Sequence, residues 1–241
     1  MLLKRGAIAL LMASSAVLFA VTGCGGGGGG GDTTKTYPLS TRLRVLQPGD
    51  SFTYKGSGNV KSGNNTTPFT VDLTTSYTTT NVANKSVFAQ ASAITFRING
   101  QNFADNNTFY LSQDGTTRDV YTLGFLDNNT ARFANKPEVS VPGTFGQGVA
   151  FTNTLTYTNG DAEQQSFTVV KSETVSVPAG RFETWRCTET SNDGDIVTNE
   201  TTWYAPQIGE LIKGEVVQTV NSTGETYTYN AELTSTNVPL Q

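Results

Sequence analysis

Much of this chain alternates, residue by residue, between apolar and threonine-rich positions. In residues 69–77, Phe69, Val71 and Leu73 fall on one face, and the positions between them carry Thr or Asp. Successive side chains of a β-strand point to opposite faces, so this alternation is typical of an antiparallel sheet with one buried face and one wet face. No helical period follows Val21, and the pattern therefore predicts an all-β fold.

Further segments support the same fold class. Residues 151–158 and 226–233 repeat the alternation, with aromatic and aliphatic residues on one face and mostly threonine on the other. Residues 87–98 and 120–126 are instead apolar on both faces, which predicts strands nearer the middle of the sheet.

Turn residues separate these segments. Asn-Gly and Asp-Gly pairs tolerate positive φ and are typical of tight hairpin turns. A stretch rich in Pro and Gly, 137–148, lies between an N-terminal group of strands and a C-terminal meander, and we interpret it as a loop within one domain. We therefore expect residues 37–241 to form a single antiparallel meander with a strongly curved sheet, either an open half-barrel (clamshell) or sandwich-like. The expected turns are Asn99-Gly100, Asp114-Gly115, Asn159-Gly160, Asp193-Gly194 and the longer Ser222-Thr223-Gly224.

The beginning of the chain has the layout of a bacterial secretory signal. A short basic start precedes an apolar run, 7–21, which is shorter than the about 20 residues that span a membrane. The run leads into the sequence VTGC, which resembles the lipobox of bacterial lipoproteins. This resemblance implies that residues 1–23 are a signal peptide cleaved between Gly23 and Cys24, and that Cys24 is then acylated with fatty acids such as palmitate. Two or three acyl chains would make the anchor effectively permanent.

Residues 24–36 are expected to be the lipidated cysteine and a flexible, glycine-rich tether. Twelve flexible residues span about 17–21 Å r.m.s., so the domain would stand off the bilayer. Gly25 follows the cysteine in place of the aspartate associated with inner-membrane retention, and this resemblance to the usual sorting pattern implies the outer membrane. The domain would face the periplasm or, as an alternative, be displayed on the cell surface.

Composition and charge exclude several classes of function. After removal of 1–23 the chain carries 14 Lys and Arg against 20 Asp and Glu, a net charge of −6, and such an acidic chain is a poor partner for nucleic acid. The chain has no histidine, which removes Ser-His-Asp and Cys-His catalysis and argues against zinc, copper and non-haem iron sites. With Cys24 acylated, Cys187 has no disulfide partner and is expected to lie inside a strand. We predict no catalytic residue, no metal and no cofactor.

One short motif imitates an enzyme. Residues 49–52 (GDSF) are similar to the nucleophile block of GDSL-type esterases, but the serine of that family needs a histidine base. We therefore interpret Asp50 and Ser51 as part of the turn that Pro48-Gly49 begins.

Two further motifs carry a resemblance to a family. Residues 177–185 (VPAGRFETW) and 202–209 (TWYAPQIG) are similar to a motif pair in an uncharacterised group of bacterial exported β-proteins, many of them lipoproteins. The match covers 173–213. The resemblance implies an open, strongly curved sheet, which is distantly similar to the clamshell of periplasmic lipoprotein carriers whose concave face holds acyl chains. Those carriers also cover the sheet with helices, and this chain shows no helical pattern after Val21.

The aromatic residues of these segments have two interpretations. As core residues, Trp185 and Trp203 would anchor the sheet, with turn residues beside them. As a binding site, they would line an apolar groove together with the tyrosines. We expect a non-catalytic, lipid-anchored envelope protein that binds an apolar ligand or an envelope partner on a concave aromatic face; the alternative is a structural or surface-interaction module that works through its threonine-rich faces. The candidate ligand-binding residues are Trp185, Trp203, Tyr204, Tyr227 and Tyr229.

Overall fold

The computed structural model describes residues 36–127 and 130–239, and these fold as thirteen β-strands. Across those two ranges no residue is helical, and no helix long and apolar enough to cross a membrane is found there. The strands are β1 (Thr36–Tyr37), β2 (Ser51–Ser62), β3 (Asn65–Val82), β4 (Lys85–Ile98), β5 (Gln101–Gln113), β6 (Val120–Asp127), β7 (Thr130–Val141), β8 (Ala150–Thr156), β9 (Ala162–Val177), β10 (Gly180–Asn192), β11 (Ile196–Ala205), β12 (Glu210–Val220) and β13 (Glu225–Thr236).

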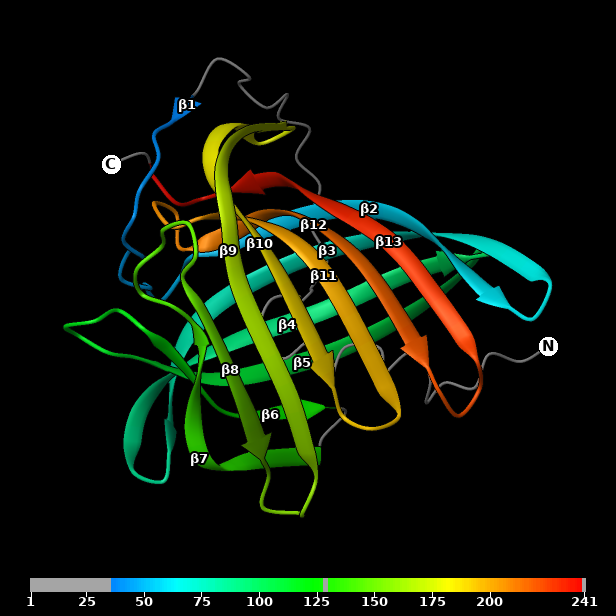
Figure 1. The fold of residues 1–241 in the computed structure, drawn as a ribbon, viewed down its shortest axis with the longest axis horizontal. Coiled ribbons are helices and arrows are strands. Elements are labelled where there is room, and N and C mark those ends of the chain that lie inside the picture. Colours follow the sequence, from blue (N-terminus) through cyan, green and yellow to red (C-terminus); the bar gives the residue numbers. More distant parts are fainter. Residues whose placement is uncertain (1–35, 128–129, 240–241) are drawn as a thin grey trace.

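All the strands belong to one sheet that curves back on itself into a barrel-shaped form with one seam (Figure 1). Its order is β7-β6-β5-β4-β3-β2-β13-β12-β11-β10-β9-β8, and every neighbouring pair in this order is antiparallel. Two meanders are therefore joined through the pairing of β2 with β13. The predicted all-β fold with a strongly curved antiparallel sheet is confirmed.

The seam lies between β7 and β8, the two ends of the strand order. Ala134 and Tyr157 form an isolated antiparallel bridge, and the side chain of Asn153 donates a hydrogen bond to the carbonyl of Val139 at 2.6 Å. Pro137 lies in β7 along this edge, where its missing N–H costs no ladder bond. The prediction of a loop over 137–148 is therefore wrong for 137–141, which belong to β7, and residues 142–149 carry the chain across the seam.

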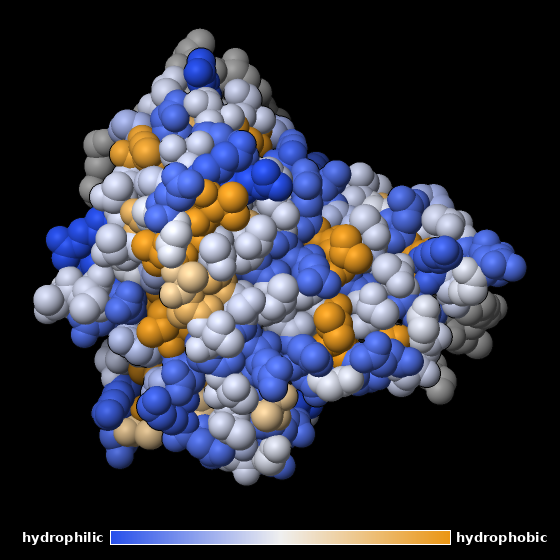
Figure 2. Space-filling model, viewed as in Figure 1, coloured by the Kyte–Doolittle hydropathy of each residue, from blue (hydrophilic) through white to orange (hydrophobic). Residues whose placement is uncertain are grey.

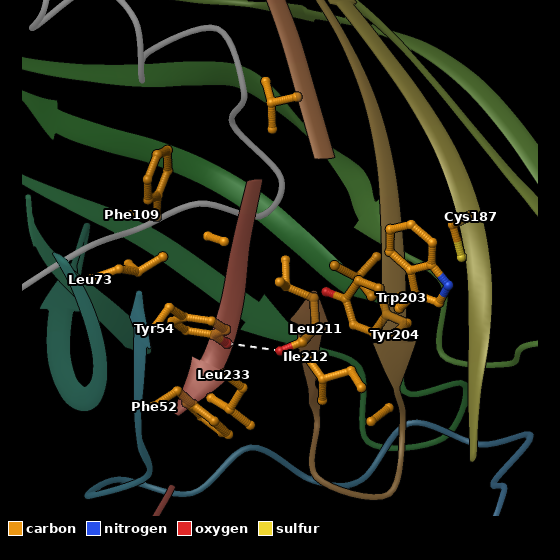
Figure 3. Packing of buried hydrophobic residues seen from close by; sticks show 14 of the residues in the cluster. Phe52, Tyr54, Leu73, Phe109, Cys187, Trp203, Tyr204, Leu211, Ile212 and Leu233 are labelled. Carbon is orange, nitrogen blue, oxygen red and sulfur yellow. Dashed lines mark hydrogen bonds between the residues drawn. The ribbon is translucent and has the colours of Figure 1, made fainter. Parts of the chain in front are cut away.

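The interior follows from the alternation in the sequence. Phe69, Val71 and Leu73 of β3 are 2–3% exposed, and Leu233 of β13 is fully buried opposite Tyr54. Figure 3 shows side chains from opposite sides of the sheet meeting in this cluster, with the Tyr54 hydroxyl donating to the carbonyl of Leu211 at 2.9 Å. Cys187 is also buried here as an unpaired thiol within β10, as the sequence predicts.

Most predicted turns are found. Asn99 and Gly100 both have positive φ, at 50° and 76°, and connect β4 to β5. Asp114-Gly115 instead begins a longer loop to β6. The prediction that 120–126 lies near the middle of the sheet is wrong, because β6 is next to the terminal strand β7. In the interior, Tyr157 from across the seam meets the Phe125 ring at a centroid distance of 5.4 Å.

One end of the sheet is crossed by residues 36–47, which we call the strap (blue in Figure 1). β1 pairs in parallel with β10, and the Tyr37 ring stacks on Phe182 with centroids 4.2 Å apart. Further along, the backbone N–H of Leu43 donates to Gly143, and that of Leu46 donates to the side chain of Gln113. The strap thereby joins loops that are distant in sequence.

Candidate functional site

A groove of about 1110 Å³ crosses the outer face of the sheet, from β10 to β3. The strand register determines its lining. Each of six strands contributes two outward-facing residues, two positions apart, and cross-strand pairing aligns these residues in two rows. Six inward-facing residues lie between the rows, so their backbones form the groove floor. The first row is Thr188, Thr201, Glu215, Asn230, Ser57 and Thr70; the second is Thr190, Asn199, Val217, Thr228, Asn59 and Pro68.

The groove walls are polar and nearly uncharged. Hydroxyl and amide side chains predominate, and Glu215 and Arg97 are the only charged residues of the lining that face outward. Val217, which is 43% exposed, is a large apolar side chain within the second row. The outer face of β10–β13 is turned toward the viewer in Figure 1, and in Figure 2 blue and white surface predominates over the right half, with separate orange spots.

Glycine permits the close strand packing beneath this groove. A Cβ placed on Gly58 would lie 2.3 Å from the carbonyl oxygen of Thr228, and one on Gly56 would lie 2.0 Å from that of Asn230. Both contacts are far inside van der Waals distance, so β2 can approach β13 this closely only with glycine at these positions. The two glycines therefore set the shape of the groove where the two meanders join.

Two carboxyl groups lie on the inner side of the groove floor. Glu189 of β10 and Glu200 of β11 are direct cross-strand partners, and both side chains point inward and are buried. Thr202 donates a hydrogen bond to Glu189 at 2.6 Å. Burial, with the charge of Glu200 as a smaller cause, holds the pKa of Glu189 well above its ordinary value. The Glu189 carboxyl therefore stays protonated to a higher pH than an exposed carboxyl does.

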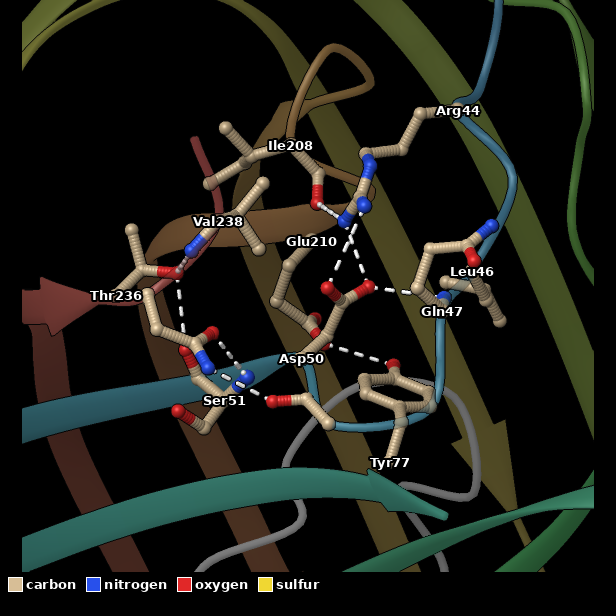
Figure 4. A network of polar contacts seen from close by, with 12 residues as sticks. Arg44, Leu46, Gln47, Asp50, Ser51, Tyr77, Ile208, Glu210, Thr236 and Val238 are labelled. Atoms are coloured by element: carbon tan, nitrogen blue, oxygen red, sulfur yellow. Dashed lines mark hydrogen bonds and ion pairs between the residues drawn. The ribbon is translucent and has the colours of Figure 1, made fainter. Parts of the chain in front are cut away.

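A second polar network lies under the strap (Figure 4). The guanidinium of Arg44 bonds both oxygens of Asp50, at 2.7 and 3.3 Å, and also donates to the carbonyl of Ile208. Close by, the Tyr77 hydroxyl donates to Glu210 at 2.9 Å. Burial raises the pKa of Glu210 to about 7, although the bonds from Leu211 and Tyr77 act in the opposite direction.

The esterase-like block belongs to this network as a turn. Asp50 accepts a hydrogen bond from the backbone of Gln47, and Gly49 has a φ of +94°. The backbone of Ser51 is held by the side chain of Asn237. Every one of these contacts fixes the start of β2, which agrees with the interpretation of residues 48–51 as a turn.

The structure gives the family-like motifs a common position at the strap. Residues 178–179 form the β9–β10 turn, and 206–209 form the β11–β12 turn with Gly209 at a φ of +79°. The indole of Trp185 donates to the carbonyl of Ser40 at 2.8 Å, and the backbone of Arg44 donates to Pro206 at 2.9 Å. Both motifs therefore hold the strap in place.

The five candidate ligand-binding residues are buried, with exposed fractions of 2–8%. Tyr204, Tyr227 and Tyr229 face the interior, and Trp185 contacts the strap. Trp203 lies on the outer face, where it packs between Arg186 and Lys213, 5.8 and 4.9 Å from the ring centre. A role for these rings in binding an apolar ligand stays a prediction. Gly23 and Cys24 lie outside the described residues.

Sequence reasoning did not locate the groove. The threonine faces of single strands were visible, but the groove depends on which positions of six strands stand side by side, and this register is absent from any one segment. Over the described ranges, no group of three or more Cys, Asp or Glu side chains is placed to hold a metal ion.

Comparisons with known proteins give little further information. No protein-family model matches the chain, and no curated protein matches it. A solved structure from Bacteroides fragilis, named "putative exported protein with YmcC-like fold", is similar over 82% of this chain and 100% of that one, at 15% identity and a TM-score of 0.35. So loose a similarity carries no argument about function.

Proposed function

We propose that this chain is a non-catalytic, lipid-anchored protein of the bacterial envelope, attached through Cys24, which holds an uncharged polar chain of the glycan kind in its outer groove. The observation that carries the binding part is the pair of hydroxyl- and amide-rich rows that line the groove. The anchor and the outer-membrane location rest on the lipobox-like sequence at residues 21–24 and on Gly25.

The chemistry of the lining favours this class of partner. Hydroxyl and amide groups both donate and accept hydrogen bonds, as the hydroxyl groups of a glycan do. Protein interfaces depend on Trp, Tyr and Arg anchors, and among the described residues the groove presents Arg97 but no outward-facing aromatic residue. A peptide could not add to the sheet here either, because the backbone groups of the floor already pair within the ladders.

Photo-crosslinking in cells tests the groove. A photoreactive phenylalanine derivative at Thr201 or Asn230 should give a cross-linked product, and the same probe at Thr79, exposed on β3 outside the groove, should give none. A product that shrinks after periodate oxidation of its sugar diols supports a glycan partner. A product that shrinks only with protease would replace it with a protein partner, and equal labelling at Thr79 would remove the groove from the proposal.

Acylation is tested separately. Cells fed radiolabelled palmitate should label the wild-type chain and not the Cys24→Ser variant, which should also leave the membrane fraction. Labelling that survives the substitution would overturn the anchor. Protease treatment of intact cells then distinguishes the two orientations, since cleavage indicates surface display and protection indicates the periplasmic side.

Native mass spectrometry tests the earlier expectation of an apolar ligand. A lipid mass that accompanies residues 25–241, is released by organic solvent and is lost in a Tyr229→Ala variant would support a ligand among the buried rings. A bare mass after incubation with lipid extract would leave the groove as the binding site.

A further inference from the structure

A second pocket, of about 470 Å³, lies beside the strap and is distinct from the outer groove. Among the described residues that line it, the charged ones are Arg42, Arg44 and Arg118, and none is acidic. Arg118 comes from the loop between β5 and β6, so the pocket joins two segments that are distant in sequence. Such a concentration of positive charge is notable in a chain whose net charge is −4.

Within the described residues, two of the three guanidinium groups have no carboxylate partner. Arg44 is neutralised by Asp50. Arg42 donates to the carbonyl of Thr116, and across residues 36–127 and 130–239 neither Arg42 nor Arg118 takes part in an ion pair. An arginine fork matches the oxygens of phosphate or carboxylate, so this pair is suited to an anion.

The acidic residues nearest to Arg118 in sequence accept hydrogen bonds from backbone groups of their own loop and of a neighbouring loop. Asp114 accepts hydrogen bonds from the backbones of Thr116 and Thr117, and these bonds hold its pKa below the ordinary value. Asp119 accepts one from the backbone of Gly143. Arg118 itself has a φ of +72°, a conformation that a non-glycine residue adopts only when its surroundings impose it.

Besides the arginines, the pocket is lined by apolar residues and by the polar side chains of Ser40, Gln47 and Gln207, and it lies next to exposed apolar side chains. Pro38, Leu43, Val45 and Pro239 contribute to the lining. Leu39 and Val45 of the strap are 40% and 38% exposed, and they are half of the large apolar side chains found exposed in the described ranges. A pocket that combines arginines with apolar side chains fits an amphiphile with an anionic head.

We propose that the strap pocket binds the phosphate of an anionic lipid headgroup through Arg42 and Arg118, with the first part of the lipid chain against Pro38, Leu43 and Val45. The strap begins at Thr36, twelve residues after Cys24, so a chain anchored at Cys24 would hold this pocket within reach of the bilayer. In this respect the inference builds on the proposed anchor, although the binding chemistry does not require acylation.

The test uses residues 25–241 without an acyl chain, since all thirteen strands lie within this range. Phosphatidylcholine vesicles with and without phosphatidylglycerol are sedimented with the wild type, with Arg42→Gln/Arg118→Gln and with Lys61→Gln/Lys136→Gln. The last variant removes the same charge outside both pockets. Each basic residue near an anionic surface contributes about fivefold to partitioning, so the pocket variant should bind about 30-fold more weakly and the control variant far less so.

Calorimetry with inorganic phosphate forms the second arm and separates the two sources of phosphate. Binding to phosphatidylglycerol vesicles that depends on Arg42 and Arg118 assigns the pocket to lipid. If free phosphate binds and this binding depends on Arg42 and Arg118, but vesicles do not bind, the pocket is a phosphate site and the lipid is ruled out as its ligand. An equal loss in the Lys61→Gln/Lys136→Gln control, or no binding in either arm, overturns the proposal.

These outcomes are independent of the proposed function. Thermal melts show whether each variant is folded before its binding is compared. Palmitate labelling of Cys24 and cross-linking at Thr201 report on the anchor and the groove, and neither measurement involves the strap pocket.

Discussion

Glu189 and Glu200 stand directly opposite each other on β10 and β11, with both carboxyl groups in the interior of the sheet. Burial raises the pKa of Glu189 well above 4.5, so folding takes up a proton at a pH where the unfolded chain has already lost it. The resulting stabilisation is fully present below about pH 4.5 and is lost as pH rises toward the raised pKa. The outer groove therefore rests on a floor whose stability depends on pH.

Glu189→Gln should increase stability at pH 8 and change little at pH 4. A glutamine keeps an oxygen that can accept the hydrogen bond from Thr202, and it has no charge to desolvate. Urea unfolding at the two pH values measures the difference, which we expect to exceed about 1 kcal/mol at pH 8. Glu232→Gln, on a partly exposed side chain, is the control and should stay within about 0.5 kcal/mol. A destabilised Glu189→Gln at pH 8 would contradict the argument.

Glu210 should produce a second, separable dependence on pH. Its pKa of about 7 lies above the 4.5 of an ordinary glutamate, so the stabilisation that it contributes is lost between about pH 4.5 and 7 and stays constant above that range. Relative to the wild type, Glu210→Gln should gain up to about 3 kcal/mol across this interval.

Tyr77→Phe provides the matching variant. It removes the hydrogen bond that the hydroxyl donates to Glu210, a bond that favours the charged carboxylate, so the end of the transition should move to higher pH. Unfolding free energies at half-unit intervals of pH test both variants. A Glu210→Gln profile parallel to that of the wild type would show that Glu210 is not the titrating group.

The sequence was sufficient to locate β3, β4, β6, β8 and β13 and most of the turns. The two-residue period of a strand is enough to predict that Phe69, Val71 and Leu73 share a buried face. Local backbone preferences are enough to predict the turn at Asn99-Gly100. The β3–β4 turn was missed because Ala83 and Asn84 take positive φ, 48° and 64°, without a glycine. There the long pairing of the two strands imposes the turn, and the local residues do not reveal it.

Local sequence patterns could not predict how the two meanders join, the path of the strap or the position of either pocket. The pairing of β2 with β13 joins Gly56 to Ala231, and no feature of either segment identifies the other. The strap lacks the alternation of a strand, and its partners come from separate parts of the chain, such as Gln113 at the end of β5 and Pro206 in the β11–β12 turn. The sequence predicts a core or binding role for the aromatic ring of Trp185, whereas in the structure its indole N–H donates a hydrogen bond to the strap.

Arg44→Met should destabilise the fold by about 3–5 kcal/mol. The side chains of Arg44 and Asp50 are only 11% and 9% exposed, so removal of the cation leaves a carboxylate buried without its counter-charge. The double variant Arg44→Met/Asp50→Asn should recover part of the loss, because the buried charge is then also removed. Lys136→Met, which breaks an ion pair with an 81% exposed lysine, should cost less than about 1 kcal/mol. Urea unfolding of the four proteins tests this, and equal effects at Arg44 and Lys136 would contradict it.

Gly56→Ala should be the most damaging small substitution in the sheet. The new Cβ would lie 2.0 Å from the carbonyl oxygen of Asn230 and 2.8 Å from Cγ1 of Val71, so the pairing of β2 with β13 must open. We expect a loss of at least about 4 kcal/mol, which belongs to the exceptional range for a single substitution. Gly63→Ala is the control: with a φ of +60° and nothing within 4 Å, it should cost only about 1–2 kcal/mol of backbone strain.

If Gly56→Ala unfolds the chain, hydrogen exchange on Gly58→Ala gives a second measurement, since its Cβ would lie 2.3 Å from the oxygen of Thr228. Faster exchange should then be confined to amides of β2 and β13, and cross-linking at Thr201 should fall because the groove changes shape. Stability equal to that of Gly63→Ala would mean that β2 and β13 can separate locally without cost. In that case glycine would not be needed for the close approach of the two strands, and another cause of the curvature beneath the groove would have to be found.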